Sequence, residues 1–372
     1  MKRSSLLFDP SLDALGVGSA HLPAPQPSPV RTLAVGLIGP GQVGRALLEQ
    51  LRDAAPRLAT RGLALPLCAV ANSRRMHLNG VESATDLEAL SQHMRAQDHH
   101  AVLVDCTAST QVAARYPQWL GVGIHVVTPN KHTGSGDLRR WHAATHAARQ
   151  SGAQWRYEAT VGAGLPVVQT LREMIDTGDT PTCIEGLFSG TLAWLFNRFD
   201  GSQPFSTLVH EARAAGYTEP DPREDLGGMD VARKLVILAR EAGWDLSLDQ
   251  VQVDGLVPAA LAALPLEQAL AHLHEIDAPL QQRLERARAA GHVLRYVGRL
   301  DASGGARVAL EALPADHAFA HGRLTDNIIA LHSQRYCANP LVIQGPGAGP
   351  EVTAAGVFAD LLRVAASLGA AA

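Results

Sequence analysis

Lysine is nearly absent from this chain of 372 residues: among 32 lysines and arginines, only Lys2, Lys131 and Lys234 are lysine. Arginine stays protonated because its pKa exceeds about 12, whereas a lysine removed from water can release its proton near neutral pH. Lys2 lies in a terminal stretch with little periodicity. Lys131 and Lys234 are therefore candidates for proton transfer. The alternative for Lys234 is a surface ion pair with Asp230 at helical spacing, worth roughly 0.3–0.5 kcal/mol.

Other scarcities exclude whole classes of protein. No run of 18 apolar residues is present, so we expect no membrane span. The net charge is −4 with no long basic run, which argues against a nucleic-acid partner. Asp9 and Asp13 interrupt the only apolar stretch near the N-terminus, so we expect no signal peptide. The four cysteines are far apart and form no CxxC pair, which favours a reducing cytoplasm over a zinc site or a disulfide framework: Cys68, Cys106, Cys183 and Cys337.

The first half of the chain alternates short apolar segments with helical patterns. Residues 1–30 are proline-rich, and we interpret them as a flexible extension. Strands are expected within 33–38, 64–73, 101–109 and 123–131, with a polar helical region after 73 and a helix ending at Gly152. This alternation predicts an α/β fold with a doubly wound parallel sheet of the Rossmann type.

The pattern changes after about residue 153. The segments CIEGLFSGT, LRYVGRLD, ARVALEAL and NIIALHSQRY resemble half-exposed strands, and Ser303–Gly305 is typical of a hairpin turn. We therefore expect a nucleotide-binding domain over 31–153, completed by a C-terminal helix within 345–372, and a second α+β domain over 154–344. The NIIALHSQRY strand is our candidate for burial in a symmetric dimer.

Gly39, Gly41 and Gly44 form the sequence GPGQVG between an expected strand and an expected helix. This context is what a dinucleotide-binding loop requires: a tight turn, close approach of the backbone to the pyrophosphate, and a helix N-terminus. A tight strand-to-helix turn without a ligand is the alternative. The next strand ends in AVANSRR with Arg74 and Arg75 and no acid, which favours NADP(H) over NAD(H). Two solvated arginines would have the same pattern.

The remaining chemistry lies in two segments. Lys131 in TPNKH follows the end of a strand, where ligands bind in open α/β sheets. Asp230 and Lys234 share one helix face, downstream of an acidic loop that contains Glu219. A substrate with a cationic amine fits between Glu219 and Asp230. His142 and His146 share a helix face without a third metal ligand, and we interpret Cys106 as a small buried residue.

Several of these segments together resemble homoserine dehydrogenase, and the resemblance spans about residues 33–368. They occur in one order, and the most specific is the fifth: GPGQVGRALLEQL, VDCTAS, HVVTPNK, EATVGAGLPV, GYTEPDPREDLGGMDVARKL and GPGAGPEVTAAGVFADLLR. These segments are most similar to the dehydrogenase half of bifunctional aspartokinase–homoserine dehydrogenases. No kinase or ACT-type segment is present in the sequence, which argues against direct threonine feedback, and we expect a dimer rather than a tetramer.

The resemblance implies an NAD(P)H-dependent cytoplasmic enzyme of threonine, methionine and isoleucine biosynthesis that reduces L-aspartate 4-semialdehyde to L-homoserine. By motif, Lys234 is implied as the proton donor, Lys131 as a second active-site lysine, and Glu219 and Asp230 as ligands of the substrate amino group. Further implied positions lie in the cofactor and substrate loops and in a site for Na⁺ or K⁺. The cofactor and substrate loop positions are Gly39, Gly41, Gln42, Val43, Gly44, Arg74, Thr107, Gly216 and Gly347. The cation positions are Glu158, Val161, Ala163 and Leu165.

Three alternative functions can be distinguished by the residues that each would require. Another NADP-dependent reductase could use the same fold. A semialdehyde dehydrogenase would require a cysteine thiolate, for which Cys106 is the only candidate. A nucleotide-sensing regulator would be expected to lose titratable groups at Lys131 and Lys234, and both are present.

Overall fold

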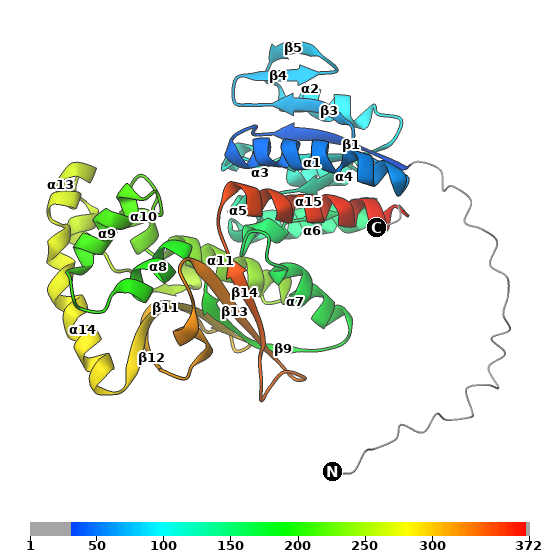
Figure 1. The fold of residues 1–372 in the computed structure, drawn as a ribbon. Helices are drawn as coiled ribbons and strands as arrows, with labels where there is room; N and C mark the ends of the chain where they lie inside the picture. Colours follow the sequence, from blue (N-terminus) through cyan, green and yellow to red (C-terminus); the bar gives the residue numbers. More distant parts are fainter. Residues whose placement is uncertain (1–30, 370–372) are drawn as a thin grey trace, which may run out of the picture.

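The computed structural model describes residues 31–369, so the expected flexible extension over 1–30 and the last three residues lie outside the described part. The chain folds into two sheets, each with its own helices (Figure 1). None of the helices in residues 31–369 combines the length and the apolar composition needed to cross a bilayer.

The first sheet confirms the expected parallel, doubly wound architecture. Its strands follow the order β5-β4-β3-β1-β6-β7-β8, with β2 paired to β1, and β3, β1, β6, β7 and β8 run parallel. β1 forms because the run Leu33–Ile38 is apolar throughout and is buried on both faces, as parallel strands require. The strands are β1 (Arg31–Ile38), β2 (Leu63–Ala64), β3 (Leu67–Ala71), β4 (Arg75–Leu78), β5 (Val81–Ala84), β6 (His100–Asp105), β7 (His125–Val127) and β8 (Trp155–Arg156).

Helices cover both faces of this sheet. Leu33, Val35 and Leu37 pack toward α1, whereas Ala34 and Ile38 belong to the core on the other side. The helices of this part are α1 (Gln42–Thr60), α2 (Leu87–Arg95), α3 (Thr110–Ala113), α4 (Tyr116–Gly121), α5 (Lys131–Ser135) and α6 (Leu138–Ser151).

The polar region after residue 73 differs from the sequence prediction. It begins as an antiparallel hairpin of β4 and β5, and a helix starts only at Leu87, where the Asp86 side chain caps α2. The hairpin forms because Asn79 (φ 47°) and Gly80 (φ 83°) both adopt the left-handed conformation of a type I′ turn. Asn-Gly is the usual sequence of that turn, so the signal was present and was misinterpreted as helical.

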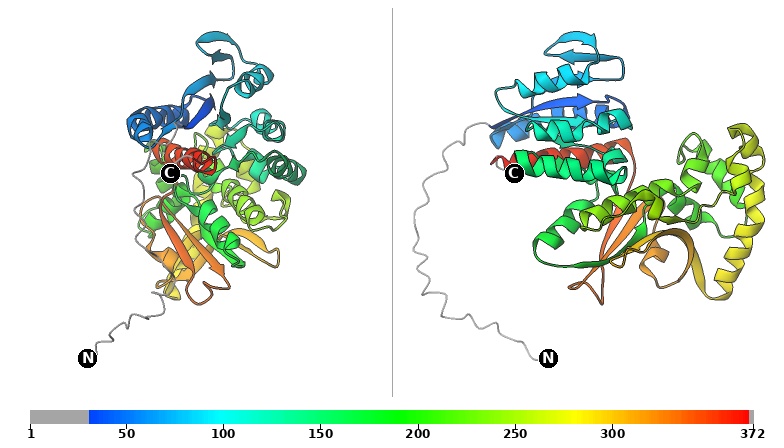
Figure 2. Two further views of the ribbon diagram at one scale, coloured as in Figure 1. Left: turned by 90° about the vertical axis from the view of Figure 1, so that its right-hand side faces the viewer. Right: turned by 180° about the vertical axis from the view of Figure 1, so that it is seen from behind.

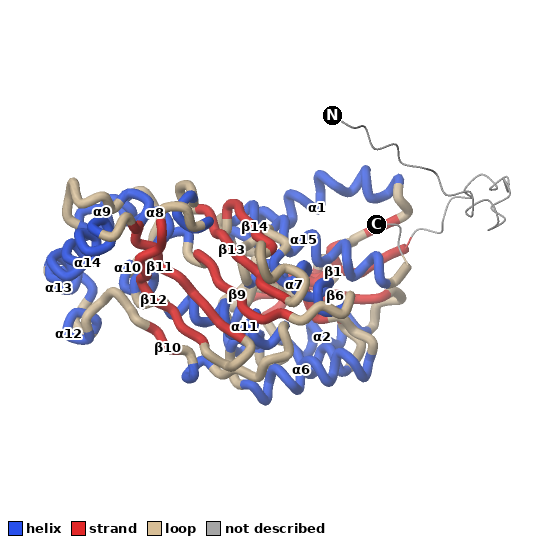
Figure 3. Tube along the Cα trace, turned by 90° about the horizontal axis from the view of Figure 1, so that it is seen from below, coloured by secondary structure: helices blue, strands red, loops and turns tan. Residues whose placement is uncertain are grey.

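The second sheet contains all four strands that the sequence indicated. Its order is β10-β12-β11-β9-β13-β14, and Figure 3 shows it from below. The turn at Ser303–Gly305 joins two antiparallel strands as expected. The strands are β9 (Pro181–Leu187), β10 (Gln252–Val253), β11 (His292–Asp301), β12 (Ala306–Pro314), β13 (Asp326–Ser333) and β14 (Leu341–Pro346).

Most helices of this part contact the second sheet or one another (Figures 1 and 3). α11 lies between the two halves of the molecule because it contacts α5 of the first and β11 and β12 of the second. The helices are α7 (Val167–Asp176), α8 (Gly190–Arg198), α9 (Phe205–Ala214), α10 (Pro222–Leu226), α11 (Met229–Glu241), α12 (Ala259–Ala262), α13 (Leu266–Ala271) and α14 (Asp277–Ala289).

The C-terminal helix α15 (Pro350–Ser367) returns to the first half and lies beside α1 (Figure 2). Its Val357, Leu361 and Val364 are fully buried in the core of the first sheet. The expected boundary at residue 153 leaves out β8, which pairs with β7, so the first sheet extends to Arg156.

The expectation that the NIIALHSQRY strand is buried by a dimer contact is not supported by the topology. β13 lies between β9 and β14, and Ile328–Leu331 are at most 3% exposed within the single chain. The free edge on this side is β14, where Val342 is 43% exposed. A sequence pattern of buried residues does not distinguish burial by a partner from burial by the chain's own strands.

Candidate active site

The glycine loop has the geometry of a pyrophosphate site. Gly39 has φ 88°, and a side chain there would meet Thr107 Cγ2 at 2.6 Å. Nothing lies within 4 Å of the side-chain position of Gly41, whereas Gly44 packs against the Gly39 carbonyl. α1 begins without a side-chain cap and without an acid in its first turn, so its N–H groups and positive end remain available to an anion.

The first turn of α1 and the end of β6 complete this loop. Gln42 is exposed and Val43 half-buried where α1 begins. Thr107, which follows β6, contacts Gly39, donates its backbone N–H to Asp105 Oδ1 at 2.8 Å, and accepts the N–H of Ser109 at 3.0 Å. The sequence-predicted positions Gln42, Val43 and Thr107 therefore lie around one turn.

The two arginines after β3 differ in their surroundings. Asn72 orders this turn because its Oδ1 accepts the backbone N–H groups of Arg74 and Arg75, each at 2.8 Å. Arg75 forms an ion pair with Glu82 of β5. Arg74 forms no ion pair with a carboxylate within residues 31–369, so its guanidinium is available to a ligand at the turn after β3.

Lys131, Asp230 and Lys234 converge at the junction of the two sheets. Asp230 Oδ2 lies 2.8 Å from Lys234 Nζ, and Asp230 Oδ1 lies 3.3 Å from Lys131 Nζ. Lys131 is the first residue of α5, directly after the loop that follows β7, whereas Asp230 and Lys234 share one face of α11. The carboxylate thus bridges the only two lysines between residues 31 and 369.

Lys234 is not a surface residue. Its side chain is 10% exposed, and its Nζ donates to the Phe188 carbonyl at 2.6 Å. Burial lowers the pKa of Lys234, Asp230 opposes that shift, and the charge of Lys131 adds to it. A buried ammonium with a lowered pKa donates its proton more readily than an exposed lysine does. The surface-pair alternative is therefore excluded.

Asp230 remains ionised in this arrangement. Its partial burial tends to raise the pKa, but the ammonium groups of Lys234 and Lys131 outweigh that effect and hold the pKa well below its usual range. Its place in the first turn of α11 also favours the negative charge, because the helix N-terminus is positive. Half of the side chain is exposed, so it can also meet a ligand.

The loop that carries Lys131 is fixed by a buried network that sequence reasoning missed. Asp105, at the end of β6, accepts the Asn130 side-chain N–H at 2.9 Å and the Tyr116 hydroxyl at 2.5 Å. Thr128 donates to the Asp105 carbonyl at 2.7 Å and accepts the Asn130 backbone N–H at 2.8 Å. Burial raises the pKa of Asp105, and these hydrogen bonds oppose the shift. A single aspartate at a strand end has no distinctive pattern in the sequence.

The acidic loop before α11 is held by a second missed residue, Asp225. Its Oδ2 accepts the Glu219 backbone N–H, and its Oδ1 accepts the Thr191 hydroxyl, each at 2.8 Å. Glu219 is exposed, so its carboxylate is free for a ligand. Gly216 has φ 75° where α9 ends, and open space surrounds it. The structure therefore places Glu219 and Gly216 on one loop between α9 and α10.

Glu158 has a structural role that the sequence did not indicate. It lies in a single 3-10 turn (Glu158–Thr160), and its carboxylate accepts the backbone N–H groups of Val168 and Gln169 where α7 begins, at 2.8 and 2.9 Å. Burial and the nearby Asp360 raise its pKa to about 7, and Arg363 opposes the shift.

The carbonyl groups of Val161 and Ala163 accept no hydrogen bond from the described residues, and Ala163 has φ 54°. The Leu165 carbonyl accepts the Val167 N–H at 2.9 Å.

The far end of α11 is anchored by a partly buried ion pair. Glu241 receives Arg172 Nε at 2.8 Å and Nη2 at 3.0 Å, and the Tyr157 hydroxyl donates to the same carboxylate. The Glu241 side chain is 8% exposed. The helix that carries Asp230 and Lys234 is thus fixed to α7 at its C-terminal end.

Other candidate groups are excluded by their surroundings. Burial, with the nearby Asp105, raises the pKa of the Cys106 thiol to about 12, so it is not a thiolate nucleophile at neutral pH. His142 pairs with Asp245 on the surface, and no group of three metal-ligating side chains occurs within residues 31–369.

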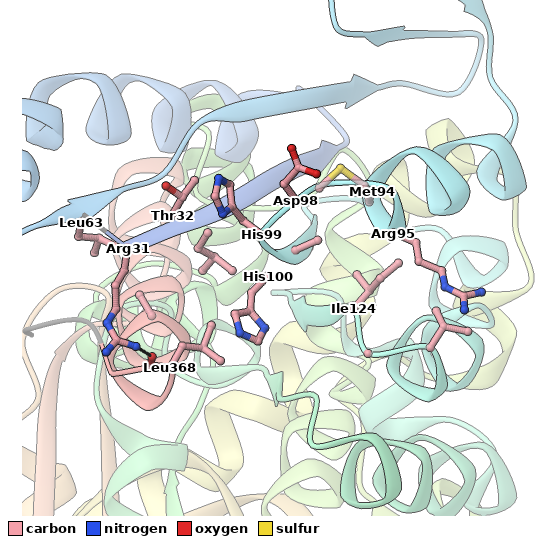
Figure 4. Close-up of a pocket in the computed structure, with 15 residues that line it drawn as sticks. Arg31, Thr32, Leu63, Met94, Arg95, Asp98, His99, His100, Ile124 and Leu368 are labelled. Atoms are coloured by element: carbon pink, nitrogen blue, oxygen red, sulfur yellow. Dashed lines mark hydrogen bonds between the residues drawn. The ribbon is translucent and has the colours of Figure 1, made fainter. Parts of the chain in front are cut away.

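A cavity of about 510 Å³ lies away from these groups, at the opposite edge of the first sheet (Figure 4). Arg31, His100 and Leu368 line it, and the Arg31 guanidinium donates to the Leu368 carbonyl. It borders the N-terminal ends of β1 and β6, whereas Thr107 and Lys131 follow the C-terminal ends of their strands. In open α/β sheets ligands bind at the C-terminal ends, so this cavity is not the candidate site.

Comparisons with known families agree with this geometry. The family model for the homoserine dehydrogenase NAD-binding domain matches residues 39–158, and the model for homoserine dehydrogenase matches residues 166–362. The second range contains both Asp230 and Lys234. Together the two ranges cover most of the chain.

Individual relatives show the same likeness. A homoserine dehydrogenase of Emericella nidulans is 42% identical over 89% of this chain and 97% of its own length. The chloroplastic bifunctional aspartokinase/homoserine dehydrogenase 1 of Zea mays is 47% identical over 91% of this chain but only 39% of its own length, so the chain spans about two fifths of that relative. A solved Candida auris protein of unknown function superimposes with a TM-score of 0.85 at 36% identity, covering 90% of this chain and 99% of that one.

Proposed function

The chain belongs to the homoserine dehydrogenase family of NAD(P)-dependent oxidoreductases, and we propose that it reduces L-aspartate 4-semialdehyde to L-homoserine. The observation that carries the proposal is the Lys131–Asp230–Lys234 arrangement at the junction of the two sheets. The product is a precursor of threonine, methionine and isoleucine, and the four free cysteines suit a reducing cytoplasm.

The reaction needs one hydride and one proton. A nicotinamide held by the glycine loop would supply the hydride to the aldehyde carbon, so that the electron pair of the π bond passes to the carbonyl oxygen. Lys234 donates a proton from Nζ to that oxygen, which completes the alcohol. The released amine recovers a proton from solvent, and Asp230 favours that recovery because its negative charge stabilises the ammonium.

The ammonium group of the substrate is bound by carboxylates of the protein. This cationic group would be bound between the carboxylate of Glu219, on the loop that Asp225 fixes, and the half-exposed carboxylate of Asp230. Lys131, whose side chain is 31% exposed, lies on the other carboxylate oxygen of Asp230 and neutralises part of its charge. Charge pairing of this kind orients the aldehyde toward Lys234.

The activity is tested by mixing the purified full chain with L-aspartate 4-semialdehyde and NADPH and following absorbance at the nicotinamide band. We expect consumption of NADPH and formation of homoserine. A chain that binds NADPH but consumes none would be a nucleotide sensor, and the proposal would be wrong.

We infer a preference for NADPH from Arg74. Replacing it, in Arg74→Glu, puts a negative charge where the 2′-phosphate binds, so the KM for NADPH is expected to rise at least about tenfold while that for NADH changes little. Michaelis constants for both cofactors provide the measurement. Arg75→Gln is the matched control, because Arg75 is already paired with Glu82. Equal changes for NADPH and NADH would show that Arg74 does not contact that phosphate.

A Na⁺ or K⁺ site is proposed at the turn of residues 158–165. The residues fit in part: the carbonyls of Val161 and Ala163 accept no hydrogen bond from the described residues, Leu165 contributes a third carbonyl, and the buried Glu158 carboxylate lies on the same turn. Carbonyl oxygens are good ligands for monovalent cations. The ion would hold this turn against α15 and not enter the chemical step. Substituting choline for potassium at constant ionic strength is expected to lower the melting temperature, and an unchanged melting temperature would contradict the site.

The protein is expected to be a dimer paired through the β14 side of the second sheet. Within residues 31–369, β14 is an edge strand of the second sheet, and its exposed Val342 lies opposite Ala330 of β13. Multi-angle light scattering at micromolar concentration is expected to give twice 39.4 kDa. Val342→Glu should shift the mass toward the monomer, whereas Val81→Glu, at an exposed residue of the first sheet, should not. A monomeric mass for the unmodified chain would contradict the proposal.

A further inference from the structure

Asn327 is a buried amide beside the proton donor. It lies in β13, is fully buried, and pairs in register with Gly345 of β14. Its Nδ2 donates to the Phe188 carbonyl at 3.1 Å. That carbonyl is the one that accepts Lys234 Nζ at 2.6 Å, so two donors from distant segments share a single oxygen.

The other side of the amide faces the loop that leads to α15. Gly347 packs so tightly on the Asn327 side chain that a Cβ at Gly347 would force this amide to shift. Asn327 Oδ1 is buried and has no hydrogen-bond partner within residues 31–369. Asn327 therefore touches a candidate cofactor loop with one face and the acceptor of Lys234 with its amino group.

We infer that Asn327 is a positioning residue, which fixes the Phe188 carbonyl and, through it, the Lys234 ammonium beside the Gly347 loop. This inference rests on the proposed function, since it assigns Lys234 the donor role. A carbonyl that accepts two hydrogen bonds has both lone pairs engaged, so its direction is set. Without the amide, one hydrogen bond from a flexible lysine would have to hold the carbonyl alone.

The amide also acts on the charge of Lys234. The positive ends of the Asn327 N–H and of the ammonium converge on one oxygen, and this repulsion favours release of the lysine proton. Removing the amide removes the repulsion, so Lys234 would hold its proton to higher pH. Stability should behave differently, because Phe188 keeps Lys234 as a donor while an unpaired buried oxygen disappears.

The test is Asn327→Leu, which keeps the volume and removes the polar atoms. We expect kcat to fall about tenfold, as misplaced catalytic groups cause, while the KM for NADPH stays within about twofold. The high-pH limb of the kcat profile should move upward, and the melting temperature should be unchanged or higher. Asn327→Asp, equal in shape, should move that limb further, since its carboxylate stabilises the ammonium.

Asp326→Asn is the control, because Asp326 is the neighbouring residue of β13 and pairs with Gln344 instead. Its rate and pH profile should equal those of the unmodified chain. If Asn327→Leu lowered both kcat and the melting temperature but left the pH dependence of kcat unchanged, Asn327 would contribute only to packing, and the inference would be wrong. A fully active Asn327→Leu would overturn the inference and leave the proposed function standing. An inactive unmodified chain would instead remove the proposed function and this inference with it.

Discussion

Lys234→Arg should fold and bind cofactor but lose most of its turnover. The guanidinium keeps the positive charge beside Asp230, so the electrostatics of α11 survive. It cannot donate a proton near neutral pH, because its pKa exceeds about 12. General acid catalysis contributes about 10²–10⁴-fold, and kcat for aldehyde reduction is expected to fall by that factor.

The measurement pairs steady-state kinetics with circular dichroism and NADPH titration, which show whether the variant is folded. Arg233→Lys is the matched control. It replaces an arginine by a lysine at the neighbouring residue of the same helix and should leave kcat unchanged. A Lys234→Arg protein with nearly the original rate would remove Lys234 from the mechanism.

Glu241→Gln is expected to give the largest loss of stability. The carboxylate receives two hydrogen bonds from Arg172 and one from the Tyr157 hydroxyl, and its side chain is 8% exposed. Glutamine keeps the shape but removes the charge and turns N–H donors toward Arg172. Breaking a buried pair costs about 3–5 kcal/mol, and the 24% exposure of Arg172 reduces this to about 2–3 kcal/mol.

A thermal melt of the full chain checks this expectation, with a drop of several degrees as the predicted result. Arg139→Gln is the control, because its pair with Asp137 is 92% exposed on the arginine side and contributes little. If both variants melted with the unmodified chain, the anchor at the end of α11 would have no role in stability.

Features set by local backbone rules were predictable from the sequence. The glycine loop requires a left-handed residue at Gly39 and a close approach at Gly44, and only glycine meets both demands. Asp230 and Lys234 were placed together because residues four apart share a helix face. Lys131 was predicted to lie in the site because ligands bind at the C-terminal ends of parallel strands, although nothing in the sequence showed that it pairs with Asp230.

Features that depend on distant contacts were not predictable. The Phe188 carbonyl is a backbone atom, so no residue type marks it as the acceptor of Lys234 and Asn327. Asp105 and Asp225 look like ordinary acidic residues, and only folding reveals what their carboxylates bind. The sequence correctly predicted that β13 is buried. It wrongly attributed that burial to a partner subunit, because periodicity does not identify which strand covers it.

The position of α15 bears on the order in which the chain can fold during synthesis. The nucleotide-binding half begins at residue 31, yet one wall of its core is made by Val357, Leu361 and Val364. While the ribosome is still adding the second sheet, α1 and β1 present an uncovered apolar surface to the cell. The half made first is therefore completed last, and a chain that stopped before Pro350 would leave that surface exposed to aggregation and degradation.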